Sequence, residues 1–314
     1  MTERIDRRTF VRRAAALATI LPMAVDGKHR GATLEAAPSV TLRVGFAAVA
    51  SDASDAPIQP HRPAFDAQAL RLGVELGIDE AKHAATLFGG EVILFPFAPT
   101  AIGTTPISAV ILGVDDVDAA SAAMRRAADR GIACLNTACS SDTLRAKACN
   151  ASLFHVVPSD AMYRDALRQA KAPAGAFAAA WDPSLVRFGA DTLNARFQAR
   201  FGRPMTSDTW CGWVAVKMLW ESALRARSAE SRALIGYLGA DTTQFDGHKG
   251  RPLSFRAWDH QLRQPVYVLR RDDRASATRV VAEAPASANP DAPSRDLLDQ
   301  LGTARAVSVC RLAQ

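Results

Sequence analysis

The chain has 314 residues, of which 48% are hydrophobic and 22% charged, as in a globular protein of one or two domains with a sizeable core. The formal net charge is +6, but the basic residues are dispersed and only 7% of residues are aromatic. This composition argues against a nucleic-acid-binding surface. No stretch after the N-terminal region is long and apolar enough to cross a membrane as a helix.

The N-terminal segment is predicted to be an export signal. Residues 6–12 read DRRTFVR, a twin-arginine pattern, and an apolar run follows over residues 14–24. That run is shorter than the roughly 20 residues that a membrane-spanning helix needs. Residues 1–38 are therefore expected to form a signal and linker that direct the chain to the periplasm through the twin-arginine pathway. A basic amphipathic helix that stays on the protein is the alternative, and several cleavage points remain open.

Strand-like and helix-like patterns alternate in the following part of the chain. Strands are predicted at residues 40–50, 91–97, 108–114, 132–135 and 153–157. Helices are predicted at residues 65–88 and 118–130, the second with Asp118 as its N-cap. The strand runs are continuously apolar, which predicts an open parallel sheet with helices on both faces.

The later part of the chain gives weaker signals. Helices are predicted at residues 162–172, 188–201 and 210–223, but no convincing strand lies within 161–204. Residues 245–269 predict two extended runs around a polar turn, a β-hairpin. The tail, 271–314, is expected to be irregular apart from a helical turn at 297–301 and a short strand at 307–312.

The hairpin sequence resembles a known family. Residues 245–269, FDGHKGRPLSFRAWDHQLRQPVYVL, resemble the C-terminal segment of periplasmic solute-binding proteins of the leucine/isoleucine/valine-binding type, the receptors of branched-chain amino acid ABC importers. The run RPLSFRAWDHQLRQP is most similar to a subgroup associated with PQQ-dependent (quinoprotein) alcohol dehydrogenase systems. Further similar runs are LRLGVELGIDEA at 70–81, NTACSSDTL at 136–144, FHVVPSD at 154–160 and FGRPM at 201–205.

The resemblance implies an α/β fold of the type-I periplasmic-binding class. Its main lobe would comprise residues 39–160 and 205–270, and residues 161–204 would be a strongly reduced second lobe. The implied protein is a receptor and not an enzyme, needs no cofactor, and closes two lobes around a small solute. Its implied partners are an inner-membrane ABC permease and a quinoprotein dehydrogenase. The alternative is a periplasmic accessory protein for the dehydrogenase, without transport cargo.

The expected ligand site lies at the carboxyl edge of the parallel sheet. Polar loops after the first, third and fourth strands meet at that edge, where open α/β sheets bind ligands. In the family that the chain resembles, hydroxyls of the loop after the fourth strand bind the ligand's charged head group. The candidate ligand-binding residues are Ser51, Asp52, Asp115, Asp116, Thr137, Ala138, Ser140, Ser141 and Asp142.

Two other chemistries are less favoured at the same edge. A hard cation could be held by the carboxylates of Asp52, Asp115, Asp116 and Asp142. A hydrolase could use the Cys139–Asp142 loop together with His155, although nothing in the sequence fixes their geometry. The scattered His83, His248 and His260 are expected on the surface.

Export makes disulfides permissible. The chain has five cysteines, so at least one thiol stays free. Cys149 with Cys310 is the preferred pair, because this bridge would pin the C-terminal tail, and Cys139 with Cys149 is the local alternative. Cys211 lies in an apolar helical run and is expected to be buried and inert.

Overall fold

The structure is a computed structural model that describes residues 39–49, 59–146, 148–271, 278–286, 296–310 and 312. The predicted export signal, 1–38, and the candidate residues Ser51 and Asp52 lie outside these residues. Within the described part of the chain, the helices fall short of the length and apolar character needed to span a bilayer.

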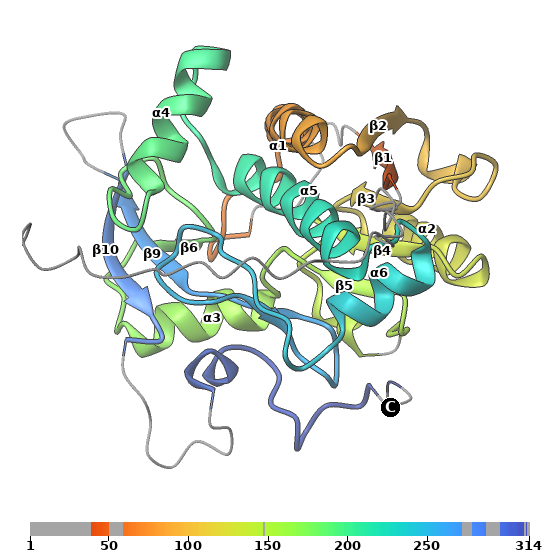
Figure 1. Ribbon diagram of the computed structural model, residues 1–314. Coiled ribbons are helices and arrows are strands. Elements are labelled where there is room, and N and C mark those ends of the chain that lie inside the picture. Colours follow the sequence, from red (N-terminus) through yellow and green to blue (C-terminus); the bar gives the residue numbers. More distant parts are fainter. Residues whose placement is uncertain are drawn as a thin grey trace, which may run out of the picture. The chain divides into compact units, whose positions relative to one another are not determined.

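The main sheet consists of five parallel strands (Figure 1). They are β1 (Thr41–Ala48), β2 (Glu91–Pro96), β3 (Ala109–Gly113), β4 (Ala133–Asn136) and β5 (Leu153–His155), in the order β2-β1-β3-β4-β5. All five were predicted from continuously apolar runs. β3 and β4 are buried at every position because helices cover both faces of the sheet.

Six helices lie within the described residues: α1 (Ala67–Leu87), α2 (Val117–Asp129), α3 (Asp160–Gln169), α4 (Ala190–Phe201), α5 (Ser207–Ala226) and α6 (Ser231–Leu238). Side chains of α1, α5 and α6 form one apolar cluster with the sheet, and those of α2 form the cluster on the opposite face. The predicted cap of α2 was wrong. Asp116 caps this helix by accepting from the backbone N–H of Ala119, and Asp118 lies within the first turn.

Helices α1 and α5 approach so closely that their backbones touch. A Cβ at Gly73 would overlap the carbonyl oxygen of Thr209, and a Cβ at Gly212 would lie 2.5 Å from the carbonyl oxygen of Leu70. Glycine at these two positions therefore permits the crossing. The crossing brings the first turn of α5 beside the start of α1.

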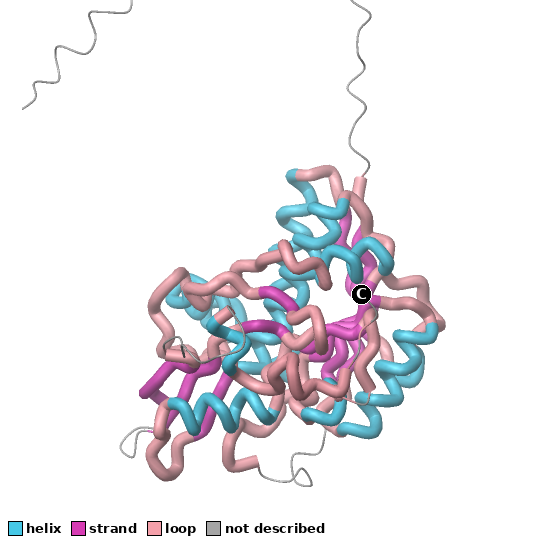
Figure 2. Tube along the Cα trace, turned by 90° about the horizontal axis from the view of Figure 1, so that it is seen from below, coloured by secondary structure: helices cyan, strands magenta, loops and turns pink. Residues whose placement is uncertain are grey.

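A second, antiparallel sheet has the strand order β10-β9-β6. Its strands are β6 (Phe177–Ala179), β9 (Val266–Arg271) and β10 (Thr278–Ala284), and Figure 2 shows the two sheets as separate groups of strands. Two predictions were wrong here: residues 161–204 do contain a strand, and the tail is not irregular throughout. β6 is only three residues long and pairs with β9 from far along the chain, so local patterns did not reveal it. The division into lobes at residues 160 and 205 stays a prediction.

The predicted hairpin pairing was wrong, because its second run, 266–269, lies in β9 and pairs with β6 and β10. A shorter hairpin forms instead. β7 (Ser254–Phe255) pairs with β8 (Leu262–Arg263), and the chain then continues into the second sheet as β9. His260, in the turn, was expected on the surface and is buried instead. Its ring stacks on Phe154 at 4.3 Å and its Nδ1 lies 2.9 Å from the carbonyl oxygen of Leu153. Burial lowers the pKa of His260 to about 4.

Three short 3₁₀ helices complete the described elements: η1 (Pro99–Ala101), η2 (Asp142–Arg145) and η3 (Leu297–Gln300). η3 is the helical turn predicted near the C-terminus. The strand predicted at 307–312 is absent from the described residues of that range.

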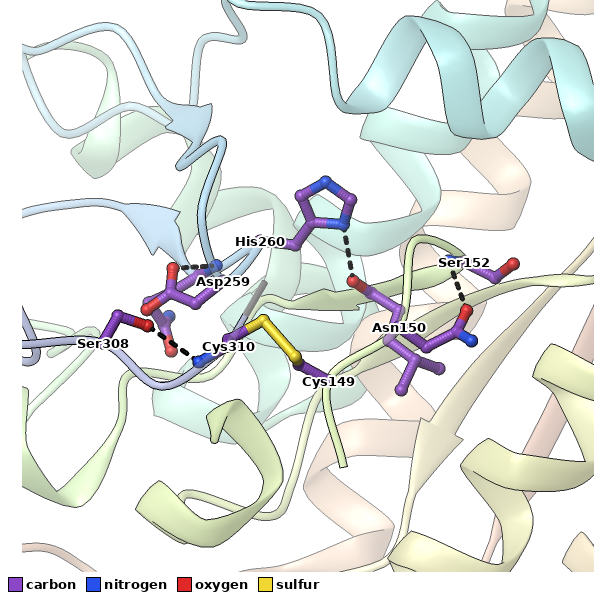
Figure 3. Close-up of a disulfide and its surroundings, with 9 residues drawn as sticks. Cys149, Asn150, Ser152, Asp259, His260, Ser308 and Cys310 are labelled. Carbon is purple, nitrogen blue, oxygen red and sulfur yellow. Dashed lines mark hydrogen bonds between the residues drawn. A yellow bond between two sulfur atoms is a disulfide. The ribbon is translucent and has the colours of Figure 1, made fainter. Parts of the chain in front are cut away.

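The C-terminal segment crosses from the second sheet to the main sheet. The backbone N–H of Gly302 donates to Asp165 on α3, and the segment ends in a disulfide between Cys310 and Cys149 (Figure 3). This is the pairing that the sequence favoured over Cys139 with Cys149. The free thiols of Cys134, Cys139 and Cys211 are buried.

Candidate functional site

Residues 59–66, which precede α1, lie between the two sheets at the carboxyl edge of the main sheet. The backbone carbonyl of His61 in this loop accepts a hydrogen bond of 2.8 Å from Ala178 of β6. Residues 59–66 therefore contact the second sheet directly, beside the edge of the main sheet where the sequence predicts the ligand site.

Arg62 pairs with two carboxylates, one that follows a strand of the main sheet and one at the start of α3. Its Nη2 lies 3.4 Å from Oδ1 of Asp115, which follows β3, and its Nε lies 3.2 Å from Oδ1 of Asp160, the first residue of α3. α3 packs against the second sheet. All three side chains are largely buried, at 13%, 15% and 20% exposure for Arg62, Asp115 and Asp160. Water therefore screens this network only weakly.

Asp160 accepts two further hydrogen bonds through the same oxygen. His61 Nε2 lies 3.1 Å away and the hydroxyl of Ser140 donates at 2.8 Å. Burial would raise the pKa of Asp160, but these hydrogen bonds and the charge of Arg62 outweigh it and lower the pKa. Asp115 behaves oppositely, because burial raises its pKa more than Arg62 lowers it. Asp160 is thus the more firmly ionised carboxylate.

Asp115 and Ser140 are the two predicted site residues that the structure brings into this cluster. Asp142 reaches the start of α3, where it accepts from the backbone N–H of Ala161 and pairs with Arg164 at 2.7 Å. The other described candidates have local partners: Asp116 caps α2, Thr137 donates to Leu112, the N–H of Ala138 donates to Asn136, and Ser141 caps η2. Thr137 and Ala138 are buried, so they shape the loop rather than face an open space.

Four residues of the cluster were missed by the sequence analysis. His61 and Arg62 lie in a proline-rich loop without periodicity, and Asp160 and Tyr163 lie on α3, beyond the predicted edge loops. The rings of Tyr163 and His61 are 6.5 Å apart. The run FHVVPSD, which ends at Asp160, was the one signal that could have identified this residue.

Asp208 adds a titratable group close to the same loop. Its carboxylate accepts from the backbone N–H of Asp66, the cap of α1, at 2.9 Å. Burial is the main cause that raises the pKa of Asp208 to about 7, and the charges of Asp66 and Asp115 add to it. Asp208 therefore titrates near neutral pH.

The described carboxylates do not form a metal site. Asp115, Asp116 and Asp142 each have a different partner, and no group of three potential metal ligands occurs among the described side chains. A calcium site would need six or more converging oxygen atoms.

The geometry for a hydrolase is not formed either. The Ser140 hydroxyl donates to Asp160 and not to a histidine. Burial raises the pKa of Cys139 to about 11, so its thiol stays protonated at neutral pH. His155 is buried with Nδ1 3.1 Å from the Asn136 amide, and burial lowers its pKa well below the usual value. Among the described residues, no histidine is hydrogen-bonded to either nucleophile.

Helix α4, which follows β6, packs against α1 beside the main sheet. Arg196 pairs with Glu80 at 2.9 Å and Arg200 pairs with Asp79. Leu193 and Phe197 of α4 belong to the same apolar cluster as α1 and α5. The segment that follows β6 is therefore joined to the helices of the main sheet by contacts other than those of the Arg62 cluster.

Comparisons with known proteins concern the fold. No protein-family model and no curated protein sequence matches the chain. A periplasmic binding protein from Burkholderia mallei has a similar structure, with a TM-score of 0.66 and 10% identity over 87% of this chain and 98% of that protein. A branched-chain amino acid ABC transporter periplasmic ligand-binding protein from Burkholderia xenovorans has a TM-score of 0.60 and 13% identity over 78% and 95%.

A solute-binding protein from Rhodopseudomonas palustris, determined in complex with benzoate, is similar as well. Its TM-score is 0.58, with 11% identity over 78% of this chain and 96% of that protein. At these identities the comparisons show the fold alone. The chain has the type-I periplasmic binding protein fold, which confirms the predicted fold class.

Proposed function

We propose that the chain is the periplasmic substrate-binding component of an ABC transporter of the branched-chain amino acid type and is not an enzyme. One observation carries the proposal: a chain with this fold gathers Arg62, Asp115, Ser140 and Asp160 at the carboxyl edge of the main sheet, facing the second sheet. Ligands of open α/β sheets bind at this edge.

The charges of the cluster favour a zwitterionic solute. An ammonium group would replace Arg62 at Asp160 and Asp115, and the released guanidinium would pair with the solute's carboxylate. The Ser140 hydroxyl would contribute a further hydrogen bond. A free amino acid carries both charges at the required short separation, so we propose amino acids as the substrate class.

The finer assignment rests on sequence resemblance. We propose export through the twin-arginine pathway on the pattern of residues 6–12, and a link to a PQQ-dependent alcohol dehydrogenase system on the resemblance of the run RPLSFRAWDHQLRQP. The proposed partners are a small solute, an inner-membrane ABC permease and a quinoprotein dehydrogenase. No cofactor is proposed for the chain itself.

A thermal-shift screen tests the proposal. Amino acids, organic acids, alcohols, PQQ, calcium and lanthanides would each be titrated against the exported protein. A receptor is stabilised in proportion to the logarithm of ligand concentration above its Kd. The proposal expects such a shift with at least one amino acid, and it is wrong if no amino acid shifts the melting temperature at millimolar concentration.

A second candidate is a periplasmic accessory protein for the dehydrogenase, without cargo. Arg62 supports it, because this side chain already satisfies the carboxylates that a solute would use. The salt bridges between α4 and α1 also restrain opening of the two sheets. Co-purification with a quinoprotein dehydrogenase, together with no response to any solute, would favour this candidate.

A further inference from the structure

A hollow lies at the amino edge of the main sheet, at the opposite ends of the strands from Asp115 and Ser140. It has a volume of about 710 Å³. The start of β1, the segment before β3, the end of α2 and the connection between α5 and α6 line it. A volume of this size suits a small molecule.

Four arginines line this hollow: Arg43, Arg130, Arg227 and Arg232. The only acidic residue in its lining is Glu230. All four arginines are exposed, and within the described part of the chain none of them forms an ion pair. The lining of the hollow therefore carries an excess of positive charge, which a bound anion would offset.

The hollow is built on fixed elements. Ser231, at the start of α6, donates to the carbonyl oxygen of Ser108 at 2.6 Å, and the Ser108 hydroxyl accepts from the backbone N–H of Arg43 at 3.1 Å. Arg130 donates from Nη1 to the carbonyl oxygen of Gly103 at 2.9 Å. The backbone positions of these arginines are therefore set by the sheet and its helices and not by a free loop.

Arg227 supplies an independent observation. It ends α5 with φ 53°, in the left-handed region. Helices commonly place glycine where the backbone turns left-handed at their C-terminus, because a side chain there costs about 1 kcal/mol or more. The chain places an arginine at this strained position, and this residue lines the hollow.

We propose that this hollow, the arginine groove, binds a small oxyanion that carries two or more phosphate or carboxylate groups. The planar guanidinium fork matches both groups in two-point contacts. Hydroxyls of Ser39, Thr41 and Thr105 also line the groove and supply further donors. The proposal does not depend on the amino acid site, which lies at the other edge of the sheet.

Isothermal titration of the exported protein with inorganic pyrophosphate and with citrate, at low ionic strength and pH 7.5, tests the proposal. Saturable one-to-one binding of either anion is expected, and the anion that binds more tightly identifies the preferred group. Raising the salt concentration should weaken anion binding, because the arginines are exposed. If neither anion binds at millimolar concentration, the proposal is overturned.

A matched pair of variants separates a site from a general charge effect. Arg43→Gln with Arg232→Gln should weaken binding at least tenfold. Arg125→Gln with Arg126→Gln removes the same charge from exposed positions of α2 outside the groove and should change affinity less than twofold. Equal weakening by both pairs would overturn the proposal.

The variant Arg227→Gly tests the contribution of Arg227 to binding without destabilising the fold. Glycine removes the left-handed strain, so this variant should melt no lower than the wild type while it binds the anion several-fold more weakly. A purely structural role for Arg227 predicts unchanged binding, and that result would count against the groove.

Discussion

Arg62 and Asp160 join the two sheets through a hydrogen bond of 3.2 Å between Nε and Oδ1, although 98 residues separate them in sequence. Arg62 comes from the loop before α1, and Asp160 begins the helix that packs on the second sheet. The same guanidinium contacts Asp115 beyond β3. Access of a solute to these carboxylates therefore requires Arg62 to change partners.

Replacement of Arg62 by alanine should destabilise the protein by about 1–3 kcal/mol at pH 7.5, because two largely buried carboxylates lose their cation. The pKa of Asp160 is lower in the folded protein than in the unfolded chain. Its pairing therefore stabilises the fold at pH values above the unfolded pKa, and this stabilisation is lost as the pH falls through the folded pKa. The difference from the wild type should therefore shrink as the pH falls from the ordinary carboxyl pKa of 3.8 through the lowered pKa of Asp160. Urea unfolding at several pH values measures it.

Arg71→Ala is the matched control for this variant. Arg71 pairs with Glu75 one turn along α1, but its side chain is 67% exposed. Loss of such a surface pair should cost less than about 0.5 kcal/mol. Equal destabilisation by both variants would contradict the structural role assigned to Arg62.

Asp208 should make stability depend on pH. Its folded pKa of about 7 lies above the ordinary value of 3.8, so its contribution is fully present below about pH 4 and is lost as the pH rises through 7. Asp208→Asn should therefore be more stable than the wild type at pH 8, by about 1–3 kcal/mol, and lose this advantage at pH 4. Thermal unfolding across this range tests the prediction. Asp191→Asn, an exposed first-turn aspartate on α4, should show no such crossover.

The helix crossing gives a steric prediction. Gly73→Ala should destabilise the protein by more than about 3 kcal/mol, because its Cβ would overlap the Thr209 backbone and force α1 from α5. Gly236, inside α6, has open space around its Cβ position. Gly236→Ala should stabilise by up to about 1 kcal/mol. Chemical denaturation of the two alanine variants compares them, and similar effects of both would contradict the close crossing.

The Cys149–Cys310 disulfide should contribute strongly to stability, because the bonded residues lie 161 positions apart. Removing a disulfide that closes a loop of this size can lower the free energy of unfolding by about 4–5 kcal/mol. The double variant Cys149→Ser, Cys310→Ser should have a lower melting temperature than the wild type. Adding reductant to the wild type should lower its melting temperature by a similar amount. A further decrease when reductant is added to the double variant would point to another disulfide.

The sequence predicted what local patterns determine. Strands β1 to β5 were predicted because apolar runs mark buried parallel strands, and α1 was predicted from its helical spacing. β6 was missed because three residues, Phe177–Ala179, form a strand only through pairing with β9. His260 was misplaced because a polar residue in a turn looks exposed until Phe154 is known to cover it.

The candidate site likewise contains some residues that the sequence predicted and others that it missed. Asp115 and Ser140 follow strands of the main sheet, so the rule for carboxyl edges identified them. Arg62 and His61 reach the same place from a proline-rich loop, and Asp160 reaches it from the start of α3. These residues come together only because of how the second sheet packs, and no local sequence pattern predicts that packing.

The most direct test of the proposed function is calorimetric titration of leucine, isoleucine, valine and other amino acids into the wild type and into Asp160→Asn. The account predicts saturable one-to-one binding of at least one amino acid to the wild type, at least tenfold weaker binding to Asp160→Asn, and unchanged binding to Asp191→Asn. Absence of binding to the wild type, or equal affinity in Asp160→Asn, would contradict it.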